Sequence, residues 1–190
     1  MYKKTITVVS GLPRSGTSMM MKMLEAGGMT ILTDEIRTAD EDNPKGYYEF
    51  ERVKQIEEDQ DWLPEAQGKA VKMIGALLRH LPPDYAYKVI FMRRRIEEVL
   101  ASQKQMLIRR GEPTDTISDE EMGALFQRHV EQIEAWLAEQ ANIDTLYVRY
   151  HEVLASPAEH AQQIDRFLGG VLDQEAMGAV VDPSLHRQRR

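Results

Sequence analysis

The feature that most constrains the fold is a glycine-containing loop near the N-terminus, which joins a predicted strand to a predicted helix. Residues 5–9 (TITVV) are rich in β-branched side chains, and residues 17–26 place apolar side chains at helical spacing. Gly11 and Gly16 lie between these two segments and permit close approach of the backbone to a ligand. Backbone N–H groups at the start of such a helix point toward one place, and the helix dipole adds roughly half a positive charge there. The segment therefore predicts a site for a phosphate or sulfate group.

The side chains of the loop also favour an anion. Ser15, Thr17 and Ser18 supply hydroxyl donors, and Arg14 supplies a fixed cation. The alternative is a nucleoside triphosphatase, because residues 11–16 have the glycine spacing of the Walker loop. That loop requires a Lys and then a Ser or Thr after its second glycine, whereas this chain has Thr17 and Ser18 there.

A second cluster of cations follows the predicted strand at residues 87–92. This strand runs into Arg93, Arg94 and Arg95, where a Walker nucleotidase would place an Asp for Mg²⁺. Three cations at a strand end repel a metal ion and attract an anion. We therefore expect an anion site that works without a metal.

The order of predicted elements indicates an α/β fold. Predicted strands alternate with predicted helices along the chain, which favours a parallel sheet covered by helices on both faces. The length of 190 residues and the absence of a convincing linker predict one domain over 1–190. The predicted strands are 5–9, 70–74, 87–92 and 145–150, and the predicted helices are 17–26, 48–59, 96–108, 117–140 and 157–168.

Composition excludes several classes of protein. The formal net charge is −7, which argues against a nucleic-acid-binding protein. The chain has no Cys, so disulfide scaffolds and Cys-ligated metal sites are excluded. No apolar run approaches the roughly 20 residues of a membrane span, and no signal-peptide pattern follows the first residues. We expect a cytoplasmic protein.

The loop and the arginine cluster together resemble the sulfotransferases that use 3′-phosphoadenosine 5′-phosphosulfate (PAPS). The loop of that family reads P-[KR]-[ST]-G-T-[ST], and this chain has Pro13-Arg14-Ser15-Gly16-Thr17-Ser18. The version GLPRSGTSMM is similar to that of the tyrosylprotein sulfotransferases, and residues 43–49 (NPKGYYE) resemble a pattern of small bacterial members. The resemblance implies a P-loop-like three-layer sandwich. It also implies that Arg14, Ser15, Gly16, Thr17 and Ser18 hold the 5′-phosphosulfate.

The resemblance also implies residues for the rest of the nucleotide. In this family an Arg at a strand end and a Ser eight residues later bind the 3′-phosphate, which corresponds to Arg94 and Ser102. Whether Arg93 or Arg95 shares that phosphate stays open. Tyr150 matches the Tyr that family members use at the nucleotide.

The predicted mechanism also requires a general base, for which the sequence offers more than one candidate. The position after Lys72, where cytosolic members carry a Thr-His pair, holds Met73-Ile74. Counting from the loop, Glu35 matches the catalytic Glu of the tyrosylprotein enzymes, while Glu49 belongs to the bacterial pattern. We expect one of these two carboxylates, or another group, to act as the base, with Arg14 stabilising the charge on the leaving phosphate.

The function predicted by this resemblance is metal-free, in-line transfer of a sulfuryl group from PAPS to a hydroxyl or amine acceptor. The product of the donor is adenosine 3′,5′-bisphosphate (PAP), and the acceptor is a small molecule, a peptide or a glycan. Two alternatives stay open at this point, namely a P-loop kinase or nucleotidase and a non-catalytic module that binds PAP or PAPS.

Overall fold

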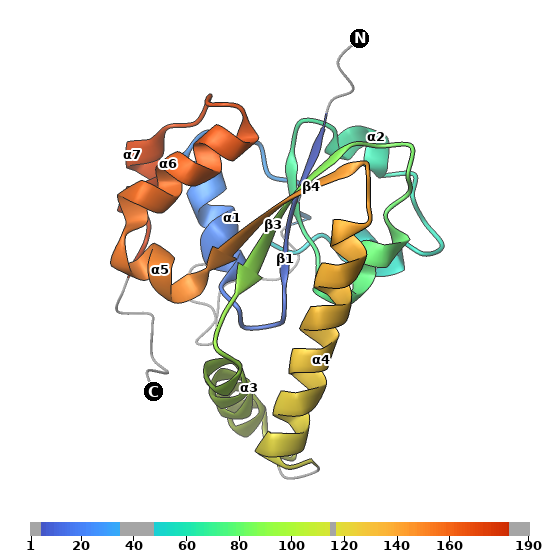
Figure 1. The fold of residues 1–190 in the computed structure, drawn as a ribbon, viewed down its shortest axis with the longest axis vertical. Helices are drawn as coiled ribbons and strands as arrows, with labels where there is room; N and C mark the ends of the chain where they lie inside the picture. The colour runs from blue at the N-terminus through green and yellow to red at the C-terminus, as the bar shows by residue number, and fades with distance from the viewer. Residues whose placement is uncertain (1–4, 35–47, 115–116, 183–190) are drawn as a thin grey trace.

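Four parallel strands form the centre of the computed structural model, which describes residues 5–34, 48–114 and 117–182 (Figure 1). Their order in the sheet is β2-β1-β3-β4, and every pairing is parallel. Parallel strands bring their carboxyl ends to one edge, which is where ligands bind in open α/β sheets. The strands are β1 (Ile6–Gly11), β2 (Ala70–Lys72), β3 (Tyr87–Arg93) and β4 (Ile143–Arg149).

Helices cover both faces of the sheet, which confirms the predicted α/β class with three layers. One face carries α1 (Thr17–Ala26), α5 (Tyr150–Ala155), α6 (Pro157–Leu168) and α7 (Gln174–Ala179) (Figure 1). The other face carries the 3₁₀ helices η1 (Glu51–Gln55) and η2 (Gly75–His80), together with α2 (Leu63–Ala66) and α4 (Asp119–Ala138).

The core is split by the sheet into two clusters of buried side chains. Alternate residues of a strand point to opposite faces, so Val8 enters the cluster under α2 and α4, while Val9 enters the cluster under α1 and α6. All six residues of β1 are buried, as expected for a central parallel strand. This burial fixes the direction in which β1 delivers the loop that follows it.

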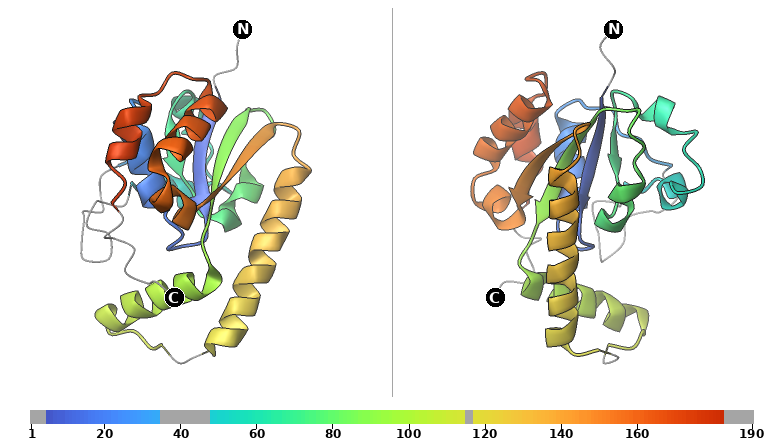
Figure 2. Two further views of the ribbon diagram at one scale, coloured as in Figure 1. Left: turned by 60° about the vertical axis from the view of Figure 1, so that its left-hand side comes forward. Right: turned by 45° about the vertical axis from the view of Figure 1, so that its right-hand side comes forward.

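Helix α3 (Ile96–Arg110) and the first turns of α4 extend beyond the carboxyl edge of the sheet (Figure 2). Helix α4 begins two residues later than predicted, because Ser118 caps it. The Ser118 hydroxyl accepts a hydrogen bond from the Glu121 N–H, and the Glu121 side chain reaches back to the Ser118 backbone. The α3–α4 pair therefore forms one wall beside the strand ends.

Two predictions of local structure are wrong. Residues 48–59 were predicted as a helix, but the chain forms only η1 and a following turn there, with Val53 and Ile56 as its buried apolar contacts. Tyr150 was predicted at the end of a strand, but it is the first residue of α5. In the part of the chain that the structure describes, no helix is long and apolar enough to cross a membrane.

The joint between α6 and α7 depends on a buried carboxylate. Asp165 is 4% exposed, and its two oxygens accept hydrogen bonds from the Leu172 N–H at 2.8 Å and the Gln174 side-chain amide at 2.7 Å. These two donors lower the pKa of the Asp165 carboxyl. The charged form of Asp165 therefore stabilises the packing of α7 against α1 and α6.

We predict that Asp165→Asn lowers the free energy of unfolding at neutral pH by roughly 1–3 kcal/mol, the range for hydrogen bonds to a charged group. Because the folded pKa is depressed, this stabilisation is present above the ordinary Asp pKa of about 3.9 and is lost as the pH falls through the folded value. Urea denaturation at several pH values measures the difference. The exposed Asp144→Asn is the control, and a pH-independent difference for Asp165→Asn would contradict the assignment.

Candidate functional site

The loop between β1 and α1 requires glycine at both of its ends. A Cβ on Gly11 would lie 2.6 Å from the Met92 carbonyl oxygen, and a Cβ on Gly16 would lie 2.4 Å from the Tyr150 ring. Gly16 also has a φ of 97°, a left-handed conformation that side chains disfavour. Arg14 has a φ of 68° without being a glycine, so contacts elsewhere must hold it.

Two contacts hold Arg14 in this conformation. Its Nε donates a hydrogen bond to the Ser102 hydroxyl at 3.0 Å, and its carbonyl oxygen accepts one from Arg94 Nη1, also at 3.0 Å. The loop is thereby tied to the end of β3 and to α3, although Arg94 and Ser102 lie 80 and 88 positions from Arg14 in the sequence. The fold brings together the three residues that the sequence assigns to the two ends of one nucleotide.

Arg94 is nearly buried and has a buried counter-charge. Its Nε lies 2.9 Å from Glu98 Oε2, and the side chains of the pair are 9% and 4% exposed. The guanidinium carbon also lies 4.5 Å from the centre of the Tyr150 ring, a cation–π distance. Burial raises the pKa of the Tyr150 hydroxyl, and the Arg94 charge acts in the opposite direction. Tyr150 therefore lies between the loop glycine and the arginine, next to both.

The three consecutive arginines point in different directions. Arg93 turns to the α4 face, where its Nε and Nη2 lie 2.7 Å from the two carboxylate oxygens of Glu134. Its guanidinium stacks 4.2 Å from the centre of the Tyr147 ring. Arg94 faces the loop instead, and Arg95 is an exposed residue at the start of α3. Arg94, rather than Arg93, therefore contacts Arg14, which also contacts Ser102.

The loop and the start of α1 have the donors that an anion requires. Ser15 is 1% exposed, and its buried hydroxyl has no hydrogen-bond partner among the described residues. Within the same part of the chain, no side chain caps the N-terminus of α1, where Thr17 and Ser18 begin the helix. Unpaired donors at a helix start are normally satisfied by a cap or a ligand. These observations fit a bound phosphosulfate group.

Sequence reasoning missed the contribution of Lys72. Its Nζ lies 3.5 Å from the Ser18 hydroxyl and 4.0 Å from Glu49 Oε1, and the Lys72 and Glu49 side chains are 15% and 21% exposed. The available signal was the position of Lys72 at the carboxyl end of a strand that pairs with β1. Of the two carboxylates predicted as the base, Glu49 therefore lies near the loop, while Glu35 lies outside the described residues.

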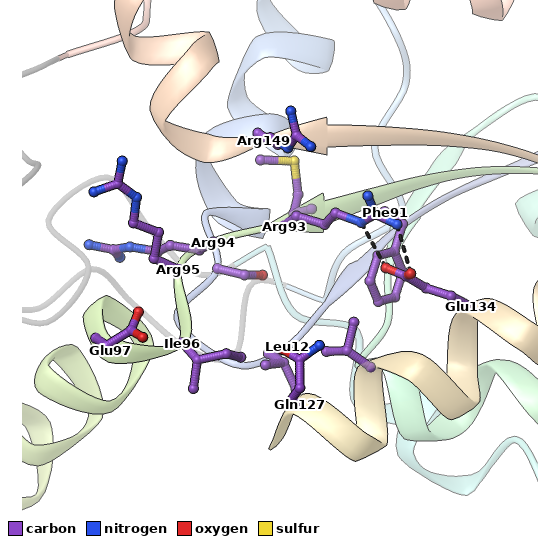
Figure 3. A pocket seen from close by; sticks show the side chains of 13 residues that line it. Leu12, Phe91, Arg93, Arg94, Arg95, Ile96, Glu97, Gln127, Glu134 and Arg149 are labelled. Carbon is purple, nitrogen blue, oxygen red and sulfur yellow. Dashed lines mark hydrogen bonds and ion pairs between the residues drawn. The ribbon is translucent and has the colours of Figure 1, made fainter. Parts of the chain in front are cut away.

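A pocket of about 460 Å³ opens beside the loop (Figure 3). Leu12 and Ser15 contribute to it from the loop, and α4 closes its far side. We call it the Arg93–Arg149 pocket, after the two arginines that end β3 and β4. Its lining residues are Leu12, Ser15, Phe91, Met92, Arg93, Arg94, Arg95, Ile96, Glu97, Gln127, Val130, Glu134 and Arg149.

Comparison of the sequence with known families gives one match. The model described as the sulfotransferase family matches residues 45–174, about two thirds of the chain. The matched segment contains Lys72, Arg94, Ser102 and Tyr150, and it begins after the loop. No curated protein sequence matches the chain.

Solved structures share the fold at low sequence identity. A sulfotransferase from Mycobacterium tuberculosis H37Rv is 17% identical with a TM-score of 0.56, and the match covers 97% of this chain and 75% of that one. A mouse sulfotransferase solved with PAP is 17% identical with a TM-score of 0.56, covering 93% of this chain and 62% of the mouse chain. Retinol dehydratase, solved with androsterone and the inactive cofactor PAP, is 17% identical with a TM-score of 0.51, covering 98% and 65%.

The buried pair of Arg94 and Glu98 yields a prediction. Glu98→Gln leaves the Arg94 charge buried without its counter-charge, so we expect the free energy of unfolding to fall by about 3–5 kcal/mol. The matched control is Glu97→Gln, an exposed neighbour, which should change it by less than about 0.5 kcal/mol. Urea denaturation measures both variants. The double variant Arg94→Met/Glu98→Gln should recover part of the loss, and equal effects of the two single variants would contradict the prediction.

Proposed function

The chain belongs to the sulfotransferase family, and from this premise we propose that it transfers a sulfuryl group from PAPS to a hydroxyl or amine of an acceptor. The observation that supports this donor is the direct contact of Arg14 with both Arg94 and Ser102 beside the uncapped start of α1. A single nucleotide with phosphates at its 5′ and 3′ positions would use both groups of donors at once.

The loop would bind the 5′ end of the donor. The N–H groups at the start of α1, the Ser15 hydroxyl and the Arg14 guanidinium are the donors there, and the helix dipole adds to them. Each hydrogen bond to a charged group contributes about 1.5–3 kcal/mol. When bound, PAPS supplies a sulfuryl group whose bond to the 5′-phosphate breaks as the acceptor oxygen or nitrogen bonds to sulfur. Arg14 would stabilise the negative charge that this cleavage leaves on the phosphate.

Arg94 and Ser102 would bind the 3′ end of the donor. The Ser102 hydroxyl accepts a hydrogen bond from Arg14 Nε, so its own proton could be donated to an oxygen of the 3′-phosphate. The Glu98 carboxylate fixes the Arg94 guanidinium through Nε, and Tyr150 covers its face. A nucleoside triphosphate lacks the 3′-phosphate and would leave this subsite unused.

The acceptor must lose a proton, and Glu49 and Glu35 are the proposed bases. Glu49 is held at its backbone, where its carbonyl oxygen accepts hydrogen bonds from the Thr33 hydroxyl at 2.8 Å and the Asp34 N–H at 3.2 Å. Its carboxylate lies beside Lys72, which also reaches Ser18 of the loop. Glu49 would therefore take the proton near the loop, with Lys72 in contact with both Glu49 and Ser18. Glu35 stays a prediction from its position in the sequence.

We predict that PAP stabilises the protein in the absence of Mg²⁺ and that ATP does so weakly. A ligand at about 100 times its Kd adds about 2.7 kcal/mol to the stability of the folded state. Thermal unfolding with PAP, AMP and ATP measures the effect, because AMP lacks only the 3′-phosphate. Ser102→Ala should reduce the shift with PAP and leave the shift with AMP unchanged. Equal shifts for PAP and ATP in the wild-type protein would contradict the proposed donor.

The proposed base can be tested with two isosteric variants. We expect Glu49→Gln or Glu35→Gln to lower kcat by about 100-fold or more, since general-base catalysis contributes roughly 10²–10⁴-fold. Transfer from radiolabelled PAPS to 4-nitrophenol is the measurement, and binding of PAP must be retained in each variant. Glu51→Gln, an exposed neighbour that pairs with Lys54, is the control. Full turnover by both test variants would exclude these carboxylates as the base.

A further inference from the structure

The Arg93–Arg149 pocket adjoins the loop, and Ser15 and Arg94 belong both to its lining and to the proposed donor site. Leu12 and Ser15 line it, whereas Arg14, Thr17 and Ser18 do not. A molecule in this pocket would therefore lie beside the loop without covering the start of α1. An acceptor must approach the sulfur atom from the side opposite the leaving phosphate, so a pocket adjoining the loop is suitably placed for it.

The lining of the pocket indicates an occupant with an apolar body. Leu12, Ile96 and Val130 contribute aliphatic surface, and Phe91 contributes an aromatic ring. The Phe91 ring packs edge-on against Tyr147, with ring centres 5.9 Å apart, which makes this wall rigid. The volume of about 460 Å³ falls within the range for small-molecule sites, about 300–1,000 Å³.

The side chains that line the pocket carry a net positive charge. Four arginines and two glutamates line it, and Glu134 is bound by Arg93 through both carboxylate oxygens. The register of the sheet places Arg93 directly beside Arg149 on the neighbouring strand. Two like charges at paired positions repel each other, so an anion between them is favoured.

Arg149 can exchange its partner for a ligand more readily than Arg93 or Arg94. Its Nη1 lies 3.0 Å from Glu152, but the two side chains are 58% and 41% exposed. Such an exposed pair contributes little stability, so a bound anion can replace the Glu152 carboxylate at small cost. Arg93 and Arg94 are held by buried or partly buried carboxylates instead, and Figure 3 shows Arg93 reaching toward Glu134 while Arg94 and Arg95 extend the other way.

We propose that the Arg93–Arg149 pocket binds the sulfate acceptor, and that it selects small acceptors that carry one anionic group, such as a carboxylate, on an apolar body. The inference rests on the proposed function, because it takes the loop as the donor site. Arg149 would bind the anionic group through its planar guanidinium, and the apolar wall would hold the body of the acceptor.

Three phenols of similar shape test the selection of charge. They are 4-hydroxyphenylacetate, tyrosol and tyramine, which carry an anionic, a neutral and a cationic group at the same distance from the phenol. Calorimetric titration into the PAP-loaded protein keeps the phosphate subsites occupied. We expect 4-hydroxyphenylacetate to bind about tenfold more tightly than tyrosol, with tyramine weakest. The preference should shrink at about 1 M ionic strength, where the Debye length is about 3 Å.

Two variants assign the selection to a residue. Arg149→Gln should remove most of the preference for 4-hydroxyphenylacetate over tyrosol and leave the affinity for PAP unchanged. Arg128→Gln, which removes an exposed charge from α4 outside the pocket lining, should keep the preference. Equal affinities for the three phenols, no binding of any of them, or an unchanged preference in Arg149→Gln would overturn the inference. Failure of PAP itself to bind would overturn the proposed function and this inference with it.

Discussion

A guanidinium buried at the end of β3 sets the arrangement of the site, because a charge removed from water must be compensated by partners at fixed positions. Glu98 compensates the Arg94 charge, Tyr150 covers its face, and the Arg14 carbonyl accepts a hydrogen bond from its Nη1. Each of these partners belongs to a different element. The single buried charge therefore holds α3, α5 and the glycine loop in one relative geometry, which a mobile loop alone would not keep.

The parallel sheet explains how residues so distant in sequence meet. Each strand ends at the same edge, so the loop after β1, Lys72 at the end of β2, Arg94 after β3 and Tyr150 after β4 come together there. Burial of β1 on both faces directs the loop that follows it to this edge. Ser15 of that loop and Arg94 also line the Arg93–Arg149 pocket, so the helix-start donors and the pocket adjoin each other.

The sequence predicted the parts of the site that local spacing determines. The loop and its following helix are contiguous, and the eight-residue interval from Arg94 to Ser102 is set by one helix, so both were predictable. The different partners of Arg93 and Arg94 were not predictable in this way, because Arg93 binds Glu134, which lies 41 positions away on another helix. The contact of Lys72 with Glu49 and Ser18 likewise depends on strand pairing. The prediction of a helix at residues 48–59 is wrong because this segment forms only a short 3₁₀ helix.

Neighbouring residues of a strand point in opposite directions, and here that alternation divides the arginines. Arg93 binds Glu134 of α4 and Arg94 binds Glu98 and the Arg14 carbonyl, although a single peptide bond joins the two residues and both line the Arg93–Arg149 pocket. Deleting or inserting one residue in β3 would reverse the side chains after the change and turn each guanidinium away from its partner. The contacts of Arg93 and those of Arg94 would therefore be lost together under a one-residue change and restored together by a compensating one.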